Sequence, residues 1–227
     1  MALELGRQGA HVAITCRGRV DAANQVAEQI QNQGGRTMVL KADVSDFSET
    51  QNLVDSVKKE LGGLHIMVCN AGVTWDGVIW KMTEKQWDTV INTNLKGYFN
   101  YNRAAAQVFK DQKYGKIVNL SSINGLRGKF AQTNYSASKG GIIALSKALA
   151  KELGKFNVNV NVVAPGMVMT EMAQNIPPEF LNVAIRETVL GRVAESEDVA
   201  NVVAFLCSDR SRHITGEVIK VDGGQYI

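Results

Sequence analysis

Cysteine is scarce in this 227-residue chain, and the three that occur, Cys16, Cys69 and Cys207, are far apart. An odd number of widely spaced cysteines disfavours a disulfide framework and fits a reducing compartment. Charge of one sign is also scarce: the formal net charge is +3, and no stretch of lysine and arginine is interleaved with aromatic residues. We therefore expect no binding to nucleic acid.

Other classes of segment are missing as well. No run of 18 apolar residues occurs, so we expect no membrane-spanning segment. The first residues lack the basic leader and apolar stretch of a secretory signal, and we expect a cytoplasmic protein. His11, His65 and His213 lie far apart and lack the spacing of metal ligands, so we expect no metal site.

What the sequence does contain is an alternation of short β-branched runs and longer amphipathic segments. The predicted strands are His11–Thr15, Thr37–Ala42, Ile66–Cys69, Lys116–Leu120, Asn159–Val163 and Glu217–Val221. The predicted helices include Ala22–Gln33, Ser48–Leu61, Lys85–Lys110, Ser136–Phe156 and Glu197–Ser208. This order predicts an α/β protein with one domain over residues 1–227, built on a doubly wound parallel sheet of the Rossmann type. Residues 171–192, which contain Pro177 and Pro178 and follow a strand end, are predicted to form a substrate lid.

The carboxyl ends of the predicted strands are polar, small or rich in glycine. They read CRGR at 16–19, DVSD at 43–46, CNAG at 69–72, LSS at 120–122 and APG at 164–166. In open α/β sheets, ligands bind beyond the carboxyl ends of the strands. We therefore expect these segments to line one binding site.

One pair of residues within this region suggests acid–base chemistry. Tyr135 and Lys139 stand four residues apart near the start of a predicted helix and so share one face. A phenol has a pKa near about 10, too high for good proton transfer at neutral pH, and a nearby ammonium lowers that pKa. Ser122, at a strand end, could hold a substrate oxygen beside the phenol. Taken alone, the pattern also fits a surface tyrosine and a solvated lysine.

Further motifs give the pair a context. NTNLKG occurs at 92–97, YSASK at 135–139 and ITGEVIKVDGG at 214–224, and Ser122 lies thirteen residues before Tyr135. With the strand-end segments, these motifs make the sequence resemble the short-chain dehydrogenase/reductase family, and most of all its 3-oxoacyl-[acyl-carrier-protein] reductases. The resemblance covers essentially the whole chain. One departure is Cys69, where the family often has Asn.

The resemblance implies a role for each matching residue. Tyr135 would be the general acid in carbonyl reduction, and Lys139 would lower its pKa and hold the nicotinamide ribose. Ser122 would orient the substrate carbonyl, and Asn94 would hold a water in a proton relay, although Asn94 could merely bond a helix backbone. The cofactor would contact Tyr135 and Lys139 together with Asp43, Val44, Asn70, Ala71, Gly72, Pro165, Gly166, Val168 and Thr170. Thr170 could alternatively only cap the next helix.

The turn after the first predicted strand bears on the choice of cofactor. Cys16 occupies the place where NAD-preferring relatives carry Asp, and Arg17 follows it. An arginine there accommodates the 2′-phosphate of NADP. We therefore expect NADP(H), with a solvated loop charge as the alternative for Arg17.

The first residues, ALELGRQGA, read as a helix that no capping residue precedes. The resemblance implies that a strand, a glycine-rich loop and a first helical turn, about 15–20 residues, would stand before Met1. That strand would lie between the strands at His11 and Ile66, and no G-x-x-x-G-x-G occurs elsewhere in the chain. Three explanations compete: an incomplete start, a short product with weakened cofactor binding, or a subunit that assembles with full-length relatives.

We expect an NADPH-dependent reductase of a 3-oxoacyl thioester, with a small-molecule or carrier-bound acyl substrate, as in fatty acid biosynthesis. The alternatives are a dehydrogenase of a small secondary alcohol or sugar, and a catalytically silent subunit of a hetero-oligomer. The helix at 136–156 carries apolar or small residues on more than one face, which predicts burial on two sides. The resemblance implies a homotetramer formed by this helix and the one containing Asn94.

Overall fold

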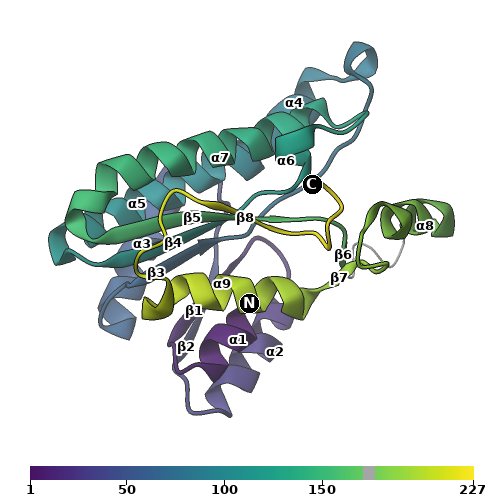
Figure 1. Cartoon of the computed structure of the whole chain (residues 1–227). Coiled ribbons are helices and arrows are strands. Elements are labelled where there is room, and N and C mark those ends of the chain that lie inside the picture. Colours follow the sequence, from purple (N-terminus) through teal and green to yellow (C-terminus); the bar gives the residue numbers. More distant parts are fainter. Residues whose placement is uncertain (171–176) are drawn as a thin grey trace.

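A computed structural model describes residues 1–170 and 177–227 of the chain (Figure 1). The main sheet is parallel and has the strand order β3-β4-β5-β8. Its strands are β3 (Ile66–Cys69), β4 (Gly115–Leu120), β5 (Val158–Pro165) and β8 (Val218–Val221). Two smaller parallel sheets pair β1 (Val12–Cys16) with β2 (Thr37–Lys41), and β6 (Val168–Met169) with β7 (Ala194–Glu195). The predicted parallel α/β fold is confirmed.

The predicted strands do not all lie in one sheet. In the described part of the chain, β1 and β3 belong to different sheets and share no ladder. These two strands correspond to the predicted strands His11–Thr15 and Ile66–Cys69. The family resemblance implies that a further strand would lie between them. Strand β1 is consequently paired along one edge only, and most of its residues are half-buried, whereas β4 is buried throughout.

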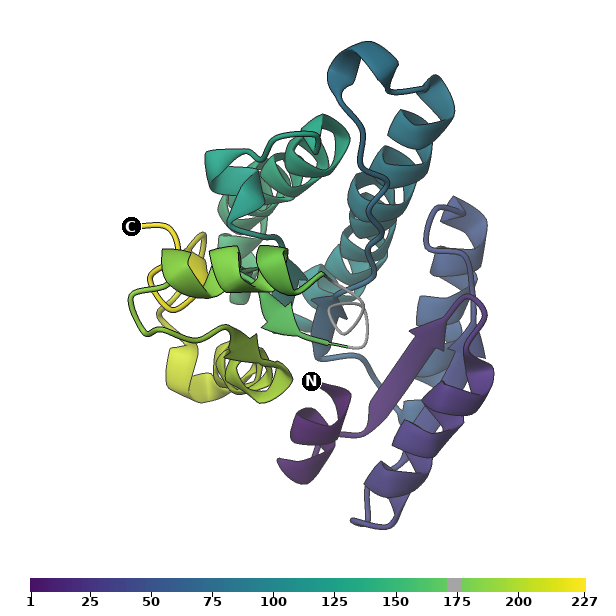
Figure 2. The same ribbon diagram turned by 90° about the vertical axis from the view of Figure 1, so that its right-hand side faces the viewer.

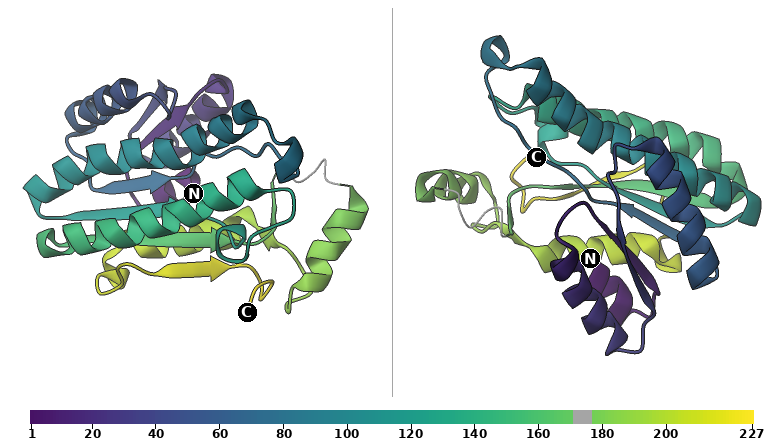
Figure 3. Two further views of the ribbon diagram at one scale, coloured as in Figure 1. Left: turned by 90° about the horizontal axis from the view of Figure 1, so that it is seen from above. Right: turned by 180° about the vertical axis from the view of Figure 1, so that it is seen from behind.

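Helices cover both faces of the main sheet. On one face, α3 (Phe47–Leu61), α5 (Gly97–Gln112) and α7 (Thr133–Leu153) enclose a core that contains Phe109, Ile117 and Ile142. Figure 3 shows α5 and α7 side by side over the strands. On the other face, α9 (Ser196–Cys207) packs against β4, β5 and β8. Helix α1 (Ala2–Arg7) adds Met1 and Leu5 to that second core.

The region around β1 stands somewhat apart from the rest (Figure 2). Here α2 (Val20–Gln31) covers β1 and β2 and also contacts α1. Further short elements are α6 (Asn124–Arg127), α8 (Pro178–Glu187) and 3₁₀ turns at Ile79–Lys81, Gly154–Phe156 and Asp209–Ser211. Helix α8 lies at the carboxyl end of β5 and is the described part of the predicted lid, whose residues 171–176 lie outside the described residues.

Local sequence explains how the helices near the site begin. The carboxylate of Asp46 caps α3 by accepting a 2.8 Å hydrogen bond from the Glu49 amide. Thr83 and Gln86 form a capping box at the start of α4 (Glu84–Ile91). The single helix predicted at 85–110 is in fact α4, a π-helical segment at Asn92–Lys96, and α5. Such π segments are rare and frequently mark functional sites.

Candidate active site

The candidate active site lies where β4 ends and α7 begins. Ser122 follows β4, and its hydroxyl accepts a 3.2 Å hydrogen bond from the Asn124 amide. The Ser122 hydroxyl also lies near the phenol of Tyr135, a residue in the first turn of α7, and acts to lower the pKa of that phenol. The serine and the phenol are therefore close enough that one substrate oxygen could contact both.

Lys139 lies one turn further along α7 and is almost fully buried, with 4% of its surface exposed. Its ammonium donates a 2.8 Å hydrogen bond to the Leu120 carbonyl and lies 5.7 Å from the centroid of the Tyr135 ring. The Ser121 hydroxyl donates to the backbone carbonyl of Lys139 at 2.8 Å. Burial lowers the pKa of Lys139 to about 8, because desolvation disfavours the charged form.

The pKa of Tyr135 differs from the sequence-based expectation. Burial raises this pKa above the ordinary value, the hydrogen bond with Ser122 lowers it, and the negative charge of Asp76 raises it further. Lys139 was expected to lower the pKa of Tyr135, but its ammonium makes its hydrogen bond to the Leu120 carbonyl. The phenol is therefore predominantly protonated at neutral pH in this structure, which is the form that a general acid needs.

Asn94 connects the loop after β3 to α7. It is fully buried within the π-helical segment, where its side chain accepts from the Val73 amide at 2.8 Å and donates to the Val73 carbonyl at 3.0 Å. It also donates to the Ser138 hydroxyl at 3.1 Å. These partners lie outside its own helix. A methyl group added to Gly72 would lie 3.6 Å from the Lys139 ammonium and 3.5 Å from the Asn94 side-chain oxygen, so the predicted Asn70, Ala71 and Gly72 turn passes beside both residues.

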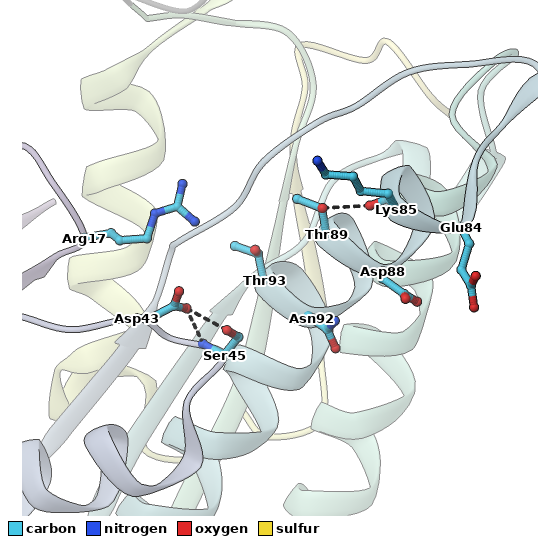
Figure 4. A pocket seen from close by; sticks show the side chains of 9 residues that line it. All are labelled: Arg17, Asp43, Ser45, Glu84, Lys85, Asp88, Thr89, Asn92 and Thr93. Atoms are coloured by element: carbon cyan, nitrogen blue, oxygen red, sulfur yellow. Dashed lines mark hydrogen bonds between the residues drawn. The ribbon is translucent and has the colours of Figure 1, made fainter.

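A second part of the site is a cavity of about 460 Å³ between the β1–β2 sheet and α4 (Figure 4). Arg17, after β1, and Asp43, after β2, lie on one side, and α4 and the π segment provide the other. The full lining is Arg17, Asp43, Ser45, Glu84, Lys85, Asp88, Thr89, Asn92 and Thr93. The sequence predicted Arg17 and Asp43 but gave no signal for Lys85 or Thr89, because a helical surface position becomes a cavity wall only through tertiary packing.

Asp43 is fixed in place before any ligand arrives. Its carboxylate accepts hydrogen bonds from the Ser45 hydroxyl at 2.7 Å and from the Ser45 amide at 2.9 Å (Figure 4). These two bonds and, to a smaller extent, the positive charge of Arg17 lower the pKa of Asp43. A charged acceptor beside an arginine in a polar cavity suits the hydroxyl and phosphate groups of a phosphorylated adenosine.

Val44, which the resemblance also predicts to contact the cofactor, is positioned by two residues of α5. A methyl group added to Gly97 would lie only 2.7 Å from a Val44 methyl carbon, so glycine is needed for this close approach. The Asn100 amide group donates to the Val44 carbonyl at 2.9 Å. Asn100 has no signal of its own in the sequence, since it lies three residues past the NTNLKG motif.

The remaining predicted cofactor residues follow β5. Pro165 ends β5 opposite Val221, and Gly166 donates to the Val221 carbonyl at 3.1 Å. A methyl group added to Gly166 would lie 2.5 Å from the Gln225 side-chain oxygen, which explains the glycine. Val168 lies in β6, and Thr170, the last described residue before the gap, is exposed.

A polar network beside Tyr135 escaped the sequence analysis. The Gln132 amide group donates to Asp76 at 2.9 Å and accepts from Asn124 at 3.1 Å. Arg127 in turn bonds Glu187 of α8 at 3.2 Å, and Gln225 bonds the same carboxylate at 2.9 Å. The network joins the loop at Asp76, α6, α8 and the C-terminal segment, which are far apart in sequence.

Within 1–170 and 177–227, no three His, Cys, Asp or Glu side chains are grouped so that they could hold a metal ion. No helix in the same two ranges has the length and apolar character needed to cross a bilayer.

The fold and this arrangement define a short-chain dehydrogenase/reductase, and the chain belongs to that family. The family model described as enoyl-(acyl carrier protein) reductase matches residues 1–225. The chain is 38% identical over 227 residues to the 3-oxoacyl-[acyl-carrier-protein] reductase FabG of Staphylococcus aureus, covering all of this chain and 92% of that protein. It is equally identical, with the same coverage, to an acetoacetyl-CoA reductase of Shinella zoogloeoides.

A solved structure agrees with these sequence matches. A protein from Sinorhizobium meliloti named after the short-chain alcohol dehydrogenases superimposes with a TM-score of 0.92 and 33% sequence identity. The match covers 99% of this chain and 89% of that one. The family to which the sequence resemblance pointed is therefore confirmed, and the protein is an oxidoreductase of this family.

Proposed function

We propose that the chain reduces the carbonyl of a 3-oxoacyl thioester to the secondary alcohol with NADPH. The observation that carries the proposal is the cluster of Ser122, Tyr135 and Lys139 at the end of β4, in which Ser122 and Lys139 are buried and Tyr135 is half-buried. The names of the relatives, which act on acyl carrier protein or coenzyme A thioesters, support the choice of substrate.

Each residue of the cluster has a chemical task in this reaction. NADPH, when bound, supplies the hydride. Ser122 donates a hydrogen bond to the carbonyl oxygen and holds it beside Tyr135. Tyr135, which burial keeps protonated, delivers its proton to that oxygen as charge develops. Lys139 then stabilises the phenolate that is left, and the water that we assign to Asn94 restores the proton.

The polar cavity fits the adenosine half of the cofactor. We assign the adenine to Asp43 and Val44, and the 2′-phosphate to Arg17, whose guanidinium lines the cavity. The nicotinamide half would contact Tyr135 and Lys139 and the segments around Asn70–Gly72 and Pro165–Thr170. The 227 residues contain no G-x-x-x-G-x-G phosphate loop, so cofactor binding is the property to test first.

The first experiment is a calorimetric titration of NADPH into the chain, followed by NADPH oxidation with acetoacetyl-CoA. Micromolar binding and turnover of the thioester support the proposal. Turnover of small alcohols or sugars without thioester reduction would favour the alternative dehydrogenase. A folded chain that neither binds nor oxidises NADPH, but co-purifies with a longer relative, would favour the silent subunit.

We also propose a cytoplasmic homotetramer. All three cysteines are free, and Cys69 and Cys207 are buried, which suits a reducing compartment. Helix α7 buries Ile142 and Ile143 yet leaves Ala144 and Ala148 exposed, a face of small side chains on which a second helix could pack closely. Sedimentation of the wild type and of Ala148→Glu tests this assembly, which the charged side chain should disrupt.

A further inference from the structure

A buried tyrosine that the proposed mechanism does not use lies beside Lys139. Tyr98, in the first turn of α5, is 1% exposed, and its hydroxyl donates a 3.0 Å hydrogen bond to the Leu120 carbonyl. That carbonyl is the same acceptor that the Lys139 ammonium uses at 2.8 Å. Two donors from two different helices thus meet at one backbone oxygen.

The sheet explains why this oxygen is available. The β3–β4 ladder ends where Cys69 pairs with Asn119, so Leu120 lies one residue beyond the last residue of β3. A carbonyl oxygen has two lone pairs, and a buried one needs at least one donor. Here two side chains, Tyr98 and Lys139, donate to the Leu120 carbonyl. This carbonyl, at the end of the β3–β4 ladder, therefore fixes the position of the Lys139 ammonium.

The rings around the ammonium form the second observation. The Lys139 ammonium lies 5.3 Å from the centroid of the Tyr98 ring and 5.7 Å from that of the Tyr135 ring. Both distances are within the range of a cation–π attraction, which is strongest where the cation is desolvated. An aromatic ring on each of two helices therefore offsets part of the cost of burying this charge.

On the basis of the proposed function, we propose that Tyr98 is a positioning residue for Lys139. The Tyr98 ring keeps the buried Lys139 ammonium charged, and the Tyr98 hydroxyl donates to the same Leu120 carbonyl as that ammonium. Other ionisable groups close to this cluster are Tyr135 on α7, Cys69 at the end of β3 and Asp76 in the loop that follows. Burial raises the pKa of Cys69 to about 12, so the thiol is neutral. The remaining neighbours carry no charge: Ser121 and Ser122 follow β4, Gly72 lies in the turn after β3, and Asn94 lies in the π segment.

The test measures the pKa of Lys139 directly, by NMR of isotope-labelled lysine in the full chain, with the signal assigned through Lys139→Arg. Tyr98→Leu removes the ring and should lower the Lys139 pKa by about one unit. Tyr98→Phe keeps the ring and should leave the pKa within about 0.3 of the wild type. Tyr101→Leu is the matched control, because Tyr101 is also buried in α5.

An unchanged pKa in Tyr98→Leu, or an equal fall in Tyr98→Phe or Tyr101→Leu, would overturn the proposal. If Tyr98→Leu does not fold, Tyr98→Met replaces it with a larger side chain and carries the same expectation. In an active enzyme, the alkaline limb of the pH–rate profile should move to lower pH by the same amount. The NMR titration needs no turnover, so a chain without reductase activity would contradict the proposed function and still test the role of Tyr98.

Discussion

The Ser122 hydroxyl lies near the phenol of Tyr135 and acts to lower its pKa, although the two residues are thirteen positions apart and lie on a strand end and a helix. The helix α6 and the loop after it bring them together, and the Asn124 amide fixes the serine oxygen. The serine hydroxyl and the phenol are thus placed where both could contact one carbonyl oxygen.

Removing the phenol hydroxyl tests this arrangement. Tyr135→Phe should lower the rate of thioester reduction by a factor of about 100 to 10,000, the range typical of a positioned general acid. Cofactor affinity should change little, because the ring and Lys139 remain. Steady-state NADPH oxidation and calorimetry on the same sample measure both. Retention of more than a tenth of the wild-type rate would mean that another group supplies the proton.

The pKa of Lys139 predicts how the reduction depends on pH. Burial lowers this pKa to about 8, so the ammonium is present below that pH and is lost as the pH rises through it. A neutral lysine cannot stabilise the phenolate of Tyr135, and the rate should therefore fall above about pH 8. The dependence of kcat/KM on pH, measured from about pH 6 to about pH 10, tests this prediction. A value of kcat/KM that stays constant above about pH 8 would contradict it.

The lowered pKa of Lys139 also predicts that the free energy of unfolding depends on pH. Between pH 8 and 10.5 the unfolded chain keeps the lysine proton that the folded chain releases, so the free energy of unfolding should rise with pH in that interval. The difference between the two pKa values corresponds to about 3 kcal/mol. Lys139→Met should lack this rise and be more stable than the wild type at neutral pH. Lys147→Met, an exposed lysine of the same helix, is the control and should behave like the wild type.

The sequence predicted the parts of the fold that depend on local pattern. All six predicted strands overlap strands of the structure, and their ends agree within one residue except at the end of β5, because β-branched runs bounded by turns specify them locally. The sequence did not predict the π-helical segment at Asn92–Lys96, because such a segment depends on which parts of the chain pack together in space.

In the candidate site, too, local sequence features could be predicted and features that depend on tertiary packing could not. Tyr135, Lys139 and Ser122 are recognisable from spacing and motif, but the direction of the Tyr135 pKa is not, since it depends on burial and on Asp76. Tyr98 looks like an ordinary apolar position of a helix in the sequence. Its role becomes visible only in the structure. The β3–β4 ladder ends one residue before Leu120, and the Tyr98 hydroxyl donates a hydrogen bond to the Leu120 carbonyl.

Arg17 should distinguish the two nicotinamide cofactors. Arg17→Ala removes the guanidinium from the polar cavity and should raise the Kd for NADPH about 10- to 100-fold, since hydrogen bonds to charged groups contribute about 1.5–3 kcal/mol. The Kd for NADH should change less than threefold. Calorimetry with both cofactors measures the difference, with Lys110→Ala, a cation in the last turn of α5, as a control. Equal losses for both would show that Arg17 does not contact the 2′-phosphate.

The ion pair between Arg127 and Glu187 predicts how α8 is held. Gln225 and Arg127 both bond the Glu187 carboxylate and lower its pKa, so this contact contributes stability above the ordinary carboxyl pKa and is lost as the pH falls through the lowered value. A double-mutant cycle of Arg127→Ala and Glu187→Ala should give a coupling energy of about 0.2–1 kcal/mol at neutral pH, as for other partly exposed pairs.

If α8 is the anchored part of a substrate lid, each single variant should also raise the KM for the thioester while leaving the Kd for NADPH near the wild-type value. The double variant should raise the KM no further than the larger single effect, because both changes release the same contact. Additive effects on KM would instead mean that Arg127 and Glu187 act on the substrate separately, and α8 would then be held by its other contacts.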